Sequence, residues 1–126
     1  MTRAAAALLG LLAGAALASG SEAVVDGRDW DRSQPYSYPV TIAAIDGKDY
    51  VDLKRRALAP GRHVLEFRTT WKPPARRFLK SREVEVVLEP CTIHRYYARH
   101  SGPFASDWEL IAMPPLPVPG CEVAKP

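Results

Sequence analysis

Three histidines are the residues of this sequence best suited to metal or acid–base chemistry: His63, His94 and His100. Zinc needs three or four ligand atoms within about 2–2.3 Å of one point. His94 and His100 fall on one face of an expected strand, where a rise of about 3.3 Å per residue separates them by roughly 20 Å. They share a metal only if the chain turns between them and His63 approaches across a sheet. We therefore expect surface histidines without a metal, and a metal site of His63 with His94 or His100 is the alternative.

Nucleophilic and paired-carboxylate catalysis find little support in the residue pattern. No serine stands in a G-x-S-x-G elbow. A Cys91–His94 pair needs a reduced cysteine, and its odd spacing on a strand places the two side chains on opposite faces. Glu83 and Glu85 share the polar face of an alternating segment, so we expect them to be exposed. The sequence predicts a non-catalytic protein without a cofactor.

The most unusual polar feature is a basic stretch over residues 71–82, which contains basic residues and no acidic one. The cations are Lys72, Arg76, Arg77, Lys80 and Arg82, interleaved with Trp71 and Phe78. Arginine forks and surface attraction suit phosphate-bearing headgroups or an acidic protein. We predict that Arg76, Arg77 and Lys80, beside Phe78, bind an anionic envelope surface or an envelope protein. The alternative is a solvated loop whose charges discourage edge-to-edge aggregation.

Aromatic residues offer a third kind of surface. Trp71, Phe104 and Trp108 can line a shallow face for a sugar or a peptide, although aromatics at strand spacing are more typical of a core. We expect Trp71 and Trp108 to form the centre of the domain, with a carbohydrate-binding face as the alternative. Three further aromatics are expected to pack over one edge of the sheet and to hold no ligand: Trp30, Tyr36 and Tyr38.

The first eighteen residues have the layout of an export signal. Arg3 gives a positive start, residues 4–17 are an apolar run, and Ala16-Leu17-Ala18 fits a signal-peptidase site. The run is shorter than the about 20 apolar residues of a membrane-spanning helix, and no cysteine directly follows it as a lipid acceptor. The sequence predicts a signal peptide over 1–18, a periplasmic or secreted mature chain, and no transmembrane segment in that chain.

Charge and cysteine content narrow the class of protein further. Residues 1–18 hold one basic and no acidic residue, so the formal charge falls from +3 to +2 without them. This weak excess, with export, argues against nucleic acid as a partner. Cys91 and Cys121 are an even pair in a small exported chain, which predicts a disulfide. Closing the roughly 30-residue loop between them stabilises the fold by about 3–4 kcal/mol in the chain-entropy model.

Short strands separated by turns must position these residues. Residues 19–39 are polar and broken by Gly and Pro, and we expect an irregular lead-in. Asp46-Gly47 is a strong hairpin signal, and Pro60-Gly61 fits a tight turn. Strands are expected at 40–45, 48–53, 62–71, 82–88, 92–99 and 107–113. Residues 40–126 therefore predict one all-β domain, a small β-sandwich of about six or seven strands with one disulfide and a proline-rich tail.

Two turn regions carry a family resemblance. Ile45-Asp46-Gly47-Lys48, followed by Leu-Ala-Pro-Gly-Arg-His-Val-Leu-Glu-Phe at 58–67, resembles the PEGA-type β module of bacterial surface and envelope proteins. The shared features are a D/N-G-K hairpin and a Leu-x-x-Gly turn that feeds an alternating apolar strand. The family's Pro-Glu-Gly turn is Ala59-Pro60-Gly61 here, and its aromatic-glycine step is missing after Phe67. The resemblance implies a small β-sandwich used as a non-catalytic recognition or spacer unit.

These observations predict an exported, non-catalytic binding or structural protein of the bacterial envelope. Two alternatives remain open at this point. The first is a periplasmic metal-binding protein that uses His63 with His94 or His100, and the second is a carbohydrate-binding module.

Overall fold

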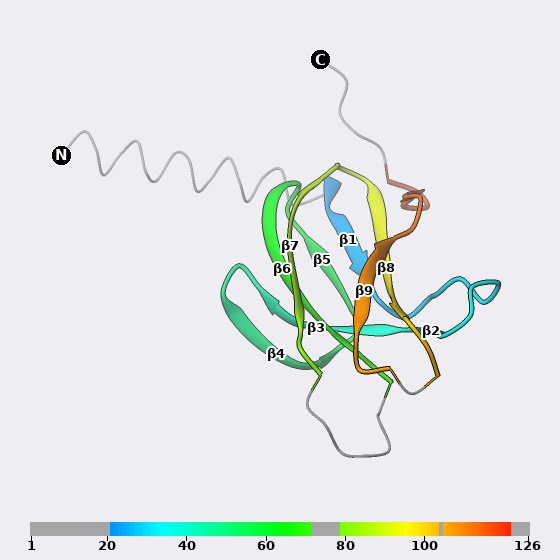
Figure 1. The fold of residues 1–126 in the computed structure, drawn as a ribbon. Coiled ribbons are helices and arrows are strands. Elements are labelled where there is room, and N and C mark those ends of the chain that lie inside the picture. Colours follow the sequence, from blue (N-terminus) through cyan, green and yellow to red (C-terminus); the bar gives the residue numbers. More distant parts are fainter. Residues whose placement is uncertain (1–20, 72–78, 104, 122–126) are drawn as a thin grey trace.

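The computed structural model describes residues 21–71, 79–103 and 105–121, and these residues form an all-β fold (Figure 1). The strands are β1 (Ala23–Asp26), β2 (Ser37–Tyr38), β3 (Val40–Ile45), β4 (Lys48–Leu53), β5 (Arg55–Leu58), β6 (Gly61–Thr69), β7 (Arg82–Leu88), β8 (Thr92–His100), β9 (Trp108–Ala112) and β10 (Leu116–Pro117). Each of the segments predicted as strands is a strand, with ends that differ by no more than two residues. The predicted signal peptide over 1–18 lies outside the described residues.

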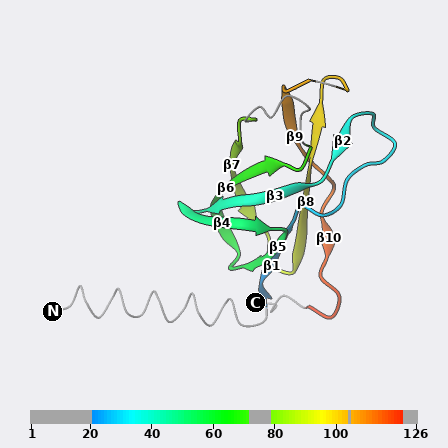
Figure 2. The ribbon, with the colours of Figure 1, turned by 90° about the horizontal axis from the view of Figure 1, so that it is seen from below.

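The strands form two sheets, as predicted for a β-sandwich (Figure 2). One sheet has four strands in the order β4-β3-β6-β7, and every pair in it is antiparallel. The other has six strands centred on β8, which pairs with β10, β1, β2 and β9. The first half of β8 lies between β10 and β1, and its second half lies between β9 and β2. This long strand therefore joins two differently built ends of the sheet.

The core lies between the sheets and follows the alternation of β6 and β7. Leu65 and Phe67 of β6 are fully buried, Leu88 of β7 is buried, and Glu83 and Glu85 are exposed as predicted. From the opposite sheet the ring of Tyr96 packs on Phe67 with centroids 4.9 Å apart. Burying such apolar side chains contributes roughly 1.5–3 kcal/mol each, so this alternation is the main reason the two sheets associate.

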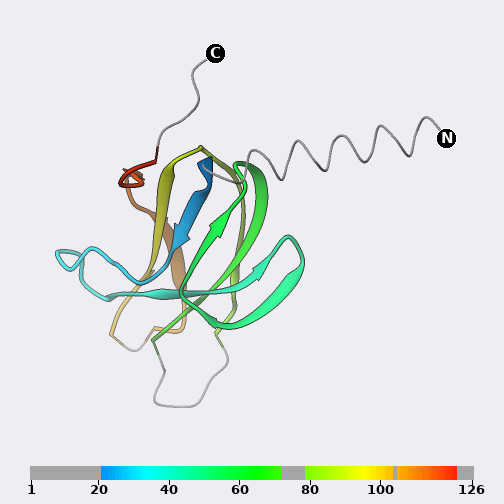
Figure 3. The same cartoon turned by 180° about the vertical axis from the view of Figure 1, so that it is seen from behind.

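The lead-in over 19–39 is more regular than predicted, because it supplies β1 and β2. β1 lies in the interior of the six-stranded sheet, parallel to β8 and antiparallel to β5, and all its residues are buried. Gly27 follows it where the chain passes against β3, and a Cβ there would lie 2.4 Å from the Val40 carbonyl oxygen. β2 continues through Pro39 into β3, so the chain passes from one sheet to the other at this proline (Figure 3).

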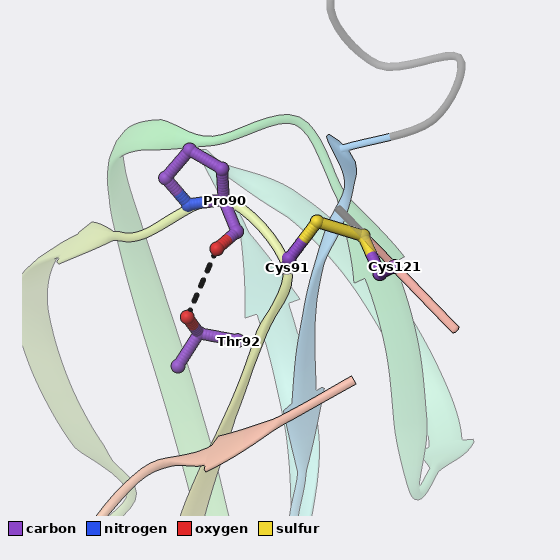
Figure 4. Close-up of a disulfide and its surroundings, with 4 residues drawn as sticks. All are labelled: Pro90, Cys91, Thr92 and Cys121. Atoms are coloured by element: carbon purple, nitrogen blue, oxygen red, sulfur yellow. Dashed lines mark hydrogen bonds between the residues drawn. A yellow bond between two sulfur atoms is a disulfide. The ribbon is translucent and has the colours of Figure 1, made fainter. Parts of the chain in front are cut away.

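The predicted disulfide between Cys91 and Cys121 is present, with Cα atoms 5.4 Å apart (Figure 4). It joins the turn before β8 to the proline-rich tail. Around it, the Cys91 carbonyl accepts a hydrogen bond from the Val118 amide at 2.9 Å, and the Cys91 amide donates to the Ser21 carbonyl at 3.3 Å. Both ends of the described chain are therefore tied to one turn. Among the described residues, no helix has the length and apolarity needed to cross a membrane.

Candidate functional site

His63 lies near the start of β6 and is bonded to one residue in each of the β3–β4 and β5–β6 turns. Its Nδ1 lies 2.6 Å from Asp46 Oδ2, and its Nε2 lies 2.7 Å from the Ala59 carbonyl oxygen. A carboxylate behind a histidine is a common arrangement for a general base, but here the second nitrogen is bonded to the backbone. Burial would raise the pKa of Asp46, yet the Val64 amide and the His63 ring outweigh it and lower that pKa. The pair fastens two turns together.

His94 has a separate structural role at the start of β8. Its Nε2 accepts a hydrogen bond from the Glu89 amide at 3.2 Å. Burial lowers the pKa of His94, partly offset by the nearby Glu89 charge. β8 runs unbroken from Thr92 to His100, so His94 and His100 stay far apart along it. In the part of the chain that the structure describes, no three His, Cys, Asp or Glu side chains are grouped to hold a metal ion.

His100 is the centre of an aromatic cluster at the other end of β8. It is 3% exposed, its Nδ1 donates to the Ala105 carbonyl at 2.9 Å, and its Nε2 lies 2.9 Å from the Thr69 hydroxyl. The Thr69 contact joins the two sheets, since Thr69 belongs to β6. Rings of Tyr38, Trp71 and Trp108 surround His100 at centroid distances of 5.4, 4.8 and 6.3 Å.

Trp108 is a core residue, as expected, and Trp71 is only partly buried at the rim of the cluster. The indole N–H of Trp108 donates to the Lys80 carbonyl at 2.9 Å. Because the ring is 3% exposed and its one polar atom is bonded, Trp108 offers little face to a sugar. Phe104, the third member of the predicted aromatic face, lies outside the described residues.

The predicted anion-binding residues fall mainly beyond what the structure describes. Arg76, Arg77 and Phe78 lie outside the described residues, whereas Lys80 is described and exposed. The described flanks of the basic stretch are held firmly. Trp71 packs on His100, and the Arg82 guanidinium donates twice to the Trp108 carbonyl, at 3.0 and 2.8 Å. Both flanks of the basic stretch therefore lie against His100 and Trp108.

A cleft of about 500 Å³ opens beside the same cluster. Three segments line it, at 34–36, 99–101 and 107–109. They come from the loop before β2, the end of β8 and the start of β9. This volume lies within the range of small-molecule sites. His100 and Trp108 line the cleft and also contact Trp71 and Arg82, the described flanks of the basic stretch, so these flanks and the cleft share one end of the sandwich.

Tyr36 stands at this cleft in a conformation that the sequence did not indicate. We expected it to pack over a sheet edge, but it is 41% exposed. Its φ of 59° lies in the left-handed region, which is uncommon for a residue other than glycine. The His100 amide donates to the Tyr36 carbonyl at 2.9 Å and fixes this turn. The only local signal was the Pro35-Tyr36 turn itself, which does not reveal exposure.

Arg99 and Glu109 are a further feature of the cleft that the sequence did not indicate. The register of β8 and β9 places them directly opposite each other. The Arg99 Nε and Nη2 groups both donate to Glu109 Oε1. The side chains are 42% and 57% exposed, so the pair lies on the surface at the cleft. Only the antiparallel register, which the sequence did not specify, brings these two residues together.

Asp26 is the centre of another group of charges. It is the last residue of β1 and lies opposite Arg95, in the middle of β8. It is 6% exposed and accepts from the Arg28 amide at 2.9 Å, from Arg28 Nη2 at 2.9 Å and from Arg55 Nη1 at 3.3 Å. Burial would raise the pKa of Asp26, but these hydrogen bonds and the two arginine charges lower it overall. Arg95, its neighbour in the register, donates to the Pro114 carbonyl at 2.8 Å. The ion pair with Arg55 therefore connects the end of β1 to β5.

Comparisons with protein-family models, with curated proteins and with solved structures found no match for this chain. The geometry of the described residues and the sequence itself are therefore the basis for a functional proposal.

Proposed function

We propose that this protein is an exported, non-catalytic binding protein of the bacterial envelope whose binding surface is the end of the sandwich around His100 and Trp108. One observation carries the proposal: both described flanks of the basic stretch lie against the two residues that also line the cleft. A cleft beside the described flanks of a charged segment is the kind of loop-built surface on which a partner can be recognised.

Export is supported by the signal-like start and by the disulfide. Disulfides persist in oxidising compartments outside the cytoplasm. The Cys91–Cys121 bond closes the end of β8 opposite the cleft, so it anchors the chain without occupying the proposed binding surface. The PEGA-type resemblance of residues 45–67 implies the same class, a small recognition or spacer module.

The proposal gives the basic stretch a role in attachment. In an envelope, Arg76, Arg77 and Lys80 meet phosphate-bearing headgroups or an acidic protein, and such contacts weaken as salt screens the charges. The metal alternative has no comparable support, because His63, His94 and His100 each bind separate protein groups.

The test is co-sedimentation of the purified protein with isolated bacterial envelopes over a range of salt concentrations. Replacing Arg76, Arg77 and Lys80 by Ser removes three cations from the proposed surface. We expect binding to fall and its salt dependence to flatten. A matched variant removes three cations from the four-stranded sheet, with Lys48, Arg62 and Arg68 each changed to Ser. Equal losses in both variants, or no loss in the first, would contradict the proposal.

A further inference from the structure

The cleft presents a nearly balanced set of charges to any ligand. Arg99 contributes one positive charge, and Asp107 and Glu109 contribute two negative ones. Asp107 Oδ1 lies 3.5 Å from Arg82 Nη2, which offsets part of the excess. Such a cleft favours neither a strongly anionic nor a strongly cationic ligand. It favours a neutral molecule that carries hydrogen-bonding groups.

The Arg99–Glu109 pair is arranged to offer a donor and an acceptor side by side. Arg99 Nε and Nη2 both donate to the same oxygen, Glu109 Oε1. Among the described residues, Arg99 Nη1 and Glu109 Oε2 make no further hydrogen bond, so both stay available to solvent or a ligand. A donor beside an acceptor on two planar groups matches the two hydroxyls of a vicinal diol, each of which both donates and accepts.

Tyr36 supplies an apolar face to the same cleft. Tyr36 is exposed, and its backbone has a positive φ. That conformation persists because the amide of the buried His100 donates a hydrogen bond to the Tyr36 carbonyl. Residues kept in sparsely populated backbone regions concentrate at ligand sites. An exposed aromatic side chain can stack on the C–H face of a sugar ring, and its hydroxyl supplies a polar edge.

We propose that the cleft over 34–36, 99–101 and 107–109 binds a neutral pyranose unit of an envelope glycan, stacked on Tyr36 with adjacent hydroxyls on Arg99 and Glu109. The inference rests on the proposed function in taking this end of the sandwich as the binding surface. It assigns the sugar contact to Tyr36, and Trp108 supports the cleft from within the core.

The test is titration calorimetry of the purified mature protein with maltose, cellobiose and N,N′-diacetylchitobiose, and with digalacturonate as an anionic probe. We expect at least one neutral disaccharide to bind with a Kd of about 1 mM or tighter. Failure of all three at about 10 mM, or stronger binding of digalacturonate, would overturn the inference.

Two substitutions test the named contacts. Tyr36→Asn removes the ring and retains a residue that tolerates the left-handed backbone, and Glu109→Gln removes the charge while retaining the shape. We expect each to raise the Kd of the bound disaccharide about tenfold, as truncating a binding hot spot does. Tyr36→Phe should bind nearly as well as the wild type. Glu85→Gln, in the ion pair with Arg62 on the other sheet, is the matched control and should have no effect.

The outcomes separate this inference from the proposed function. The variant with Arg76, Arg77 and Lys80 replaced by Ser should lose salt-dependent envelope binding and still bind the disaccharide. Loss of envelope binding in that variant, with no sugar binding by the wild type, would leave the proposed function and overturn the inference. Sugar binding that Tyr36→Asn and Glu109→Gln leave unchanged would place the sugar elsewhere and also overturn the inference.

Discussion

The two ends of β8 are closed by different means. At the start of β8, a covalent bond joins Cys91 to Cys121, and backbone hydrogen bonds add Ser21 and Val118. At its other end, the buried side chain of His100 gathers Thr69, Ala105 and three aromatic rings without any covalent link. One end is therefore fixed through the backbone, and the other through a side-chain cluster.

The difference has a physical cause. β10 has two residues, one of them proline, and a proline-rich tail lacks the amides needed for a long ladder. A covalent link compensates for those missing bonds. At the opposite end, the loop before β2, the end of β8 and the start of β9 meet, and the cleft lies between them. The disulfide end therefore anchors the proline-rich tail, whereas the His100 end has the cleft that we propose as the binding surface.

The largest expected effect comes from opening the covalent end. Changing both Cys91 and Cys121 to Ser should lower the free energy of unfolding by about 3–4 kcal/mol, because the roughly 30-residue loop of the unfolded chain is no longer constrained. Urea denaturation measures this loss. Below the new midpoint, the fluorescence of the cluster tryptophans should stay native, because the contacts of His100 with Thr69, Ala105 and Trp71 do not involve the disulfide. A loss below about 1 kcal/mol would show that backbone bonds alone hold this end.

The next effect comes from the cluster end. His100→Leu should cost about 2–3 kcal/mol, since it removes the partner of the Ala105 carbonyl and one of the two partners of the Thr69 hydroxyl in a part-buried place. His94→Leu should cost about 1 kcal/mol or less, because the half-buried His94 accepts a single bond. Urea denaturation of both variants gives the comparison. Equal costs would mean that the cluster does not hold the second end of β8.

A smaller effect is expected at Asp26, between the two ends. Asp26→Asn should cost about 1–2 kcal/mol at pH 7, because the partners Arg28 and Arg55 are half-exposed and only part of the pairing energy is lost. The folded-state pKa of Asp26 lies below the unfolded value of about 3.9, so its stabilisation is complete above that pH.

That stabilisation should disappear as the pH falls from about 4 through the folded-state pKa. The wild type should therefore lose more stability on acidification than Asp26→Asn does. Asp46, whose pKa is also lowered, contributes with the same sign in both proteins. Thermal unfolding between pH 7 and pH 3 measures the difference. Parallel pH profiles for the two proteins would contradict a role for Asp26 ionisation.

The smallest effect on stability is expected at the cleft pair. Glu109→Gln and the control Glu85→Gln should each change the free energy of unfolding by less than about 0.5 kcal/mol, as for other exposed ion pairs. Only Glu109→Gln should weaken binding of the disaccharide. A large stability loss in Glu109→Gln would show that the ion pair with Arg99 stabilises the fold. It would also weaken the contrast between the disulfide end of β8 and the His100 end.

Much of the strand pattern could be predicted, because alternation and turn residues are local. Asp46-Gly47 predicted the β3–β4 turn, and the two residues have φ values of 50° and 84°. β1 was missed for a physical reason. Its four residues are all buried, so they show no alternation, and they follow a polar start. Only pairing with β5 and β8 makes that short apolar segment a strand.

The candidate site could not be predicted in the same way. Tyr36, Arg99 and Glu109 come from three distant segments, and no spacing rule relates them. Their placement depends on the β8–β9 register and on the backbone at Tyr36, which His100 holds. The sequence pointed to the flanking basic stretch instead, since clustered charge is visible without a fold.

Local sequence patterns were enough to predict the all-β class, the alternating faces of β6 and β7, the turn at Asp46-Gly47 and the pairing of two cysteines. The first three depend on residues that are close together along the chain. The cysteines pair because the chain contains only two of them. The internal place of β1, the separate roles of His63, His94 and His100, and the cleft beside His100 became apparent only from the folded chain. These features depend on contacts between residues far apart in the chain, which form only when the two sheets close on the shared core.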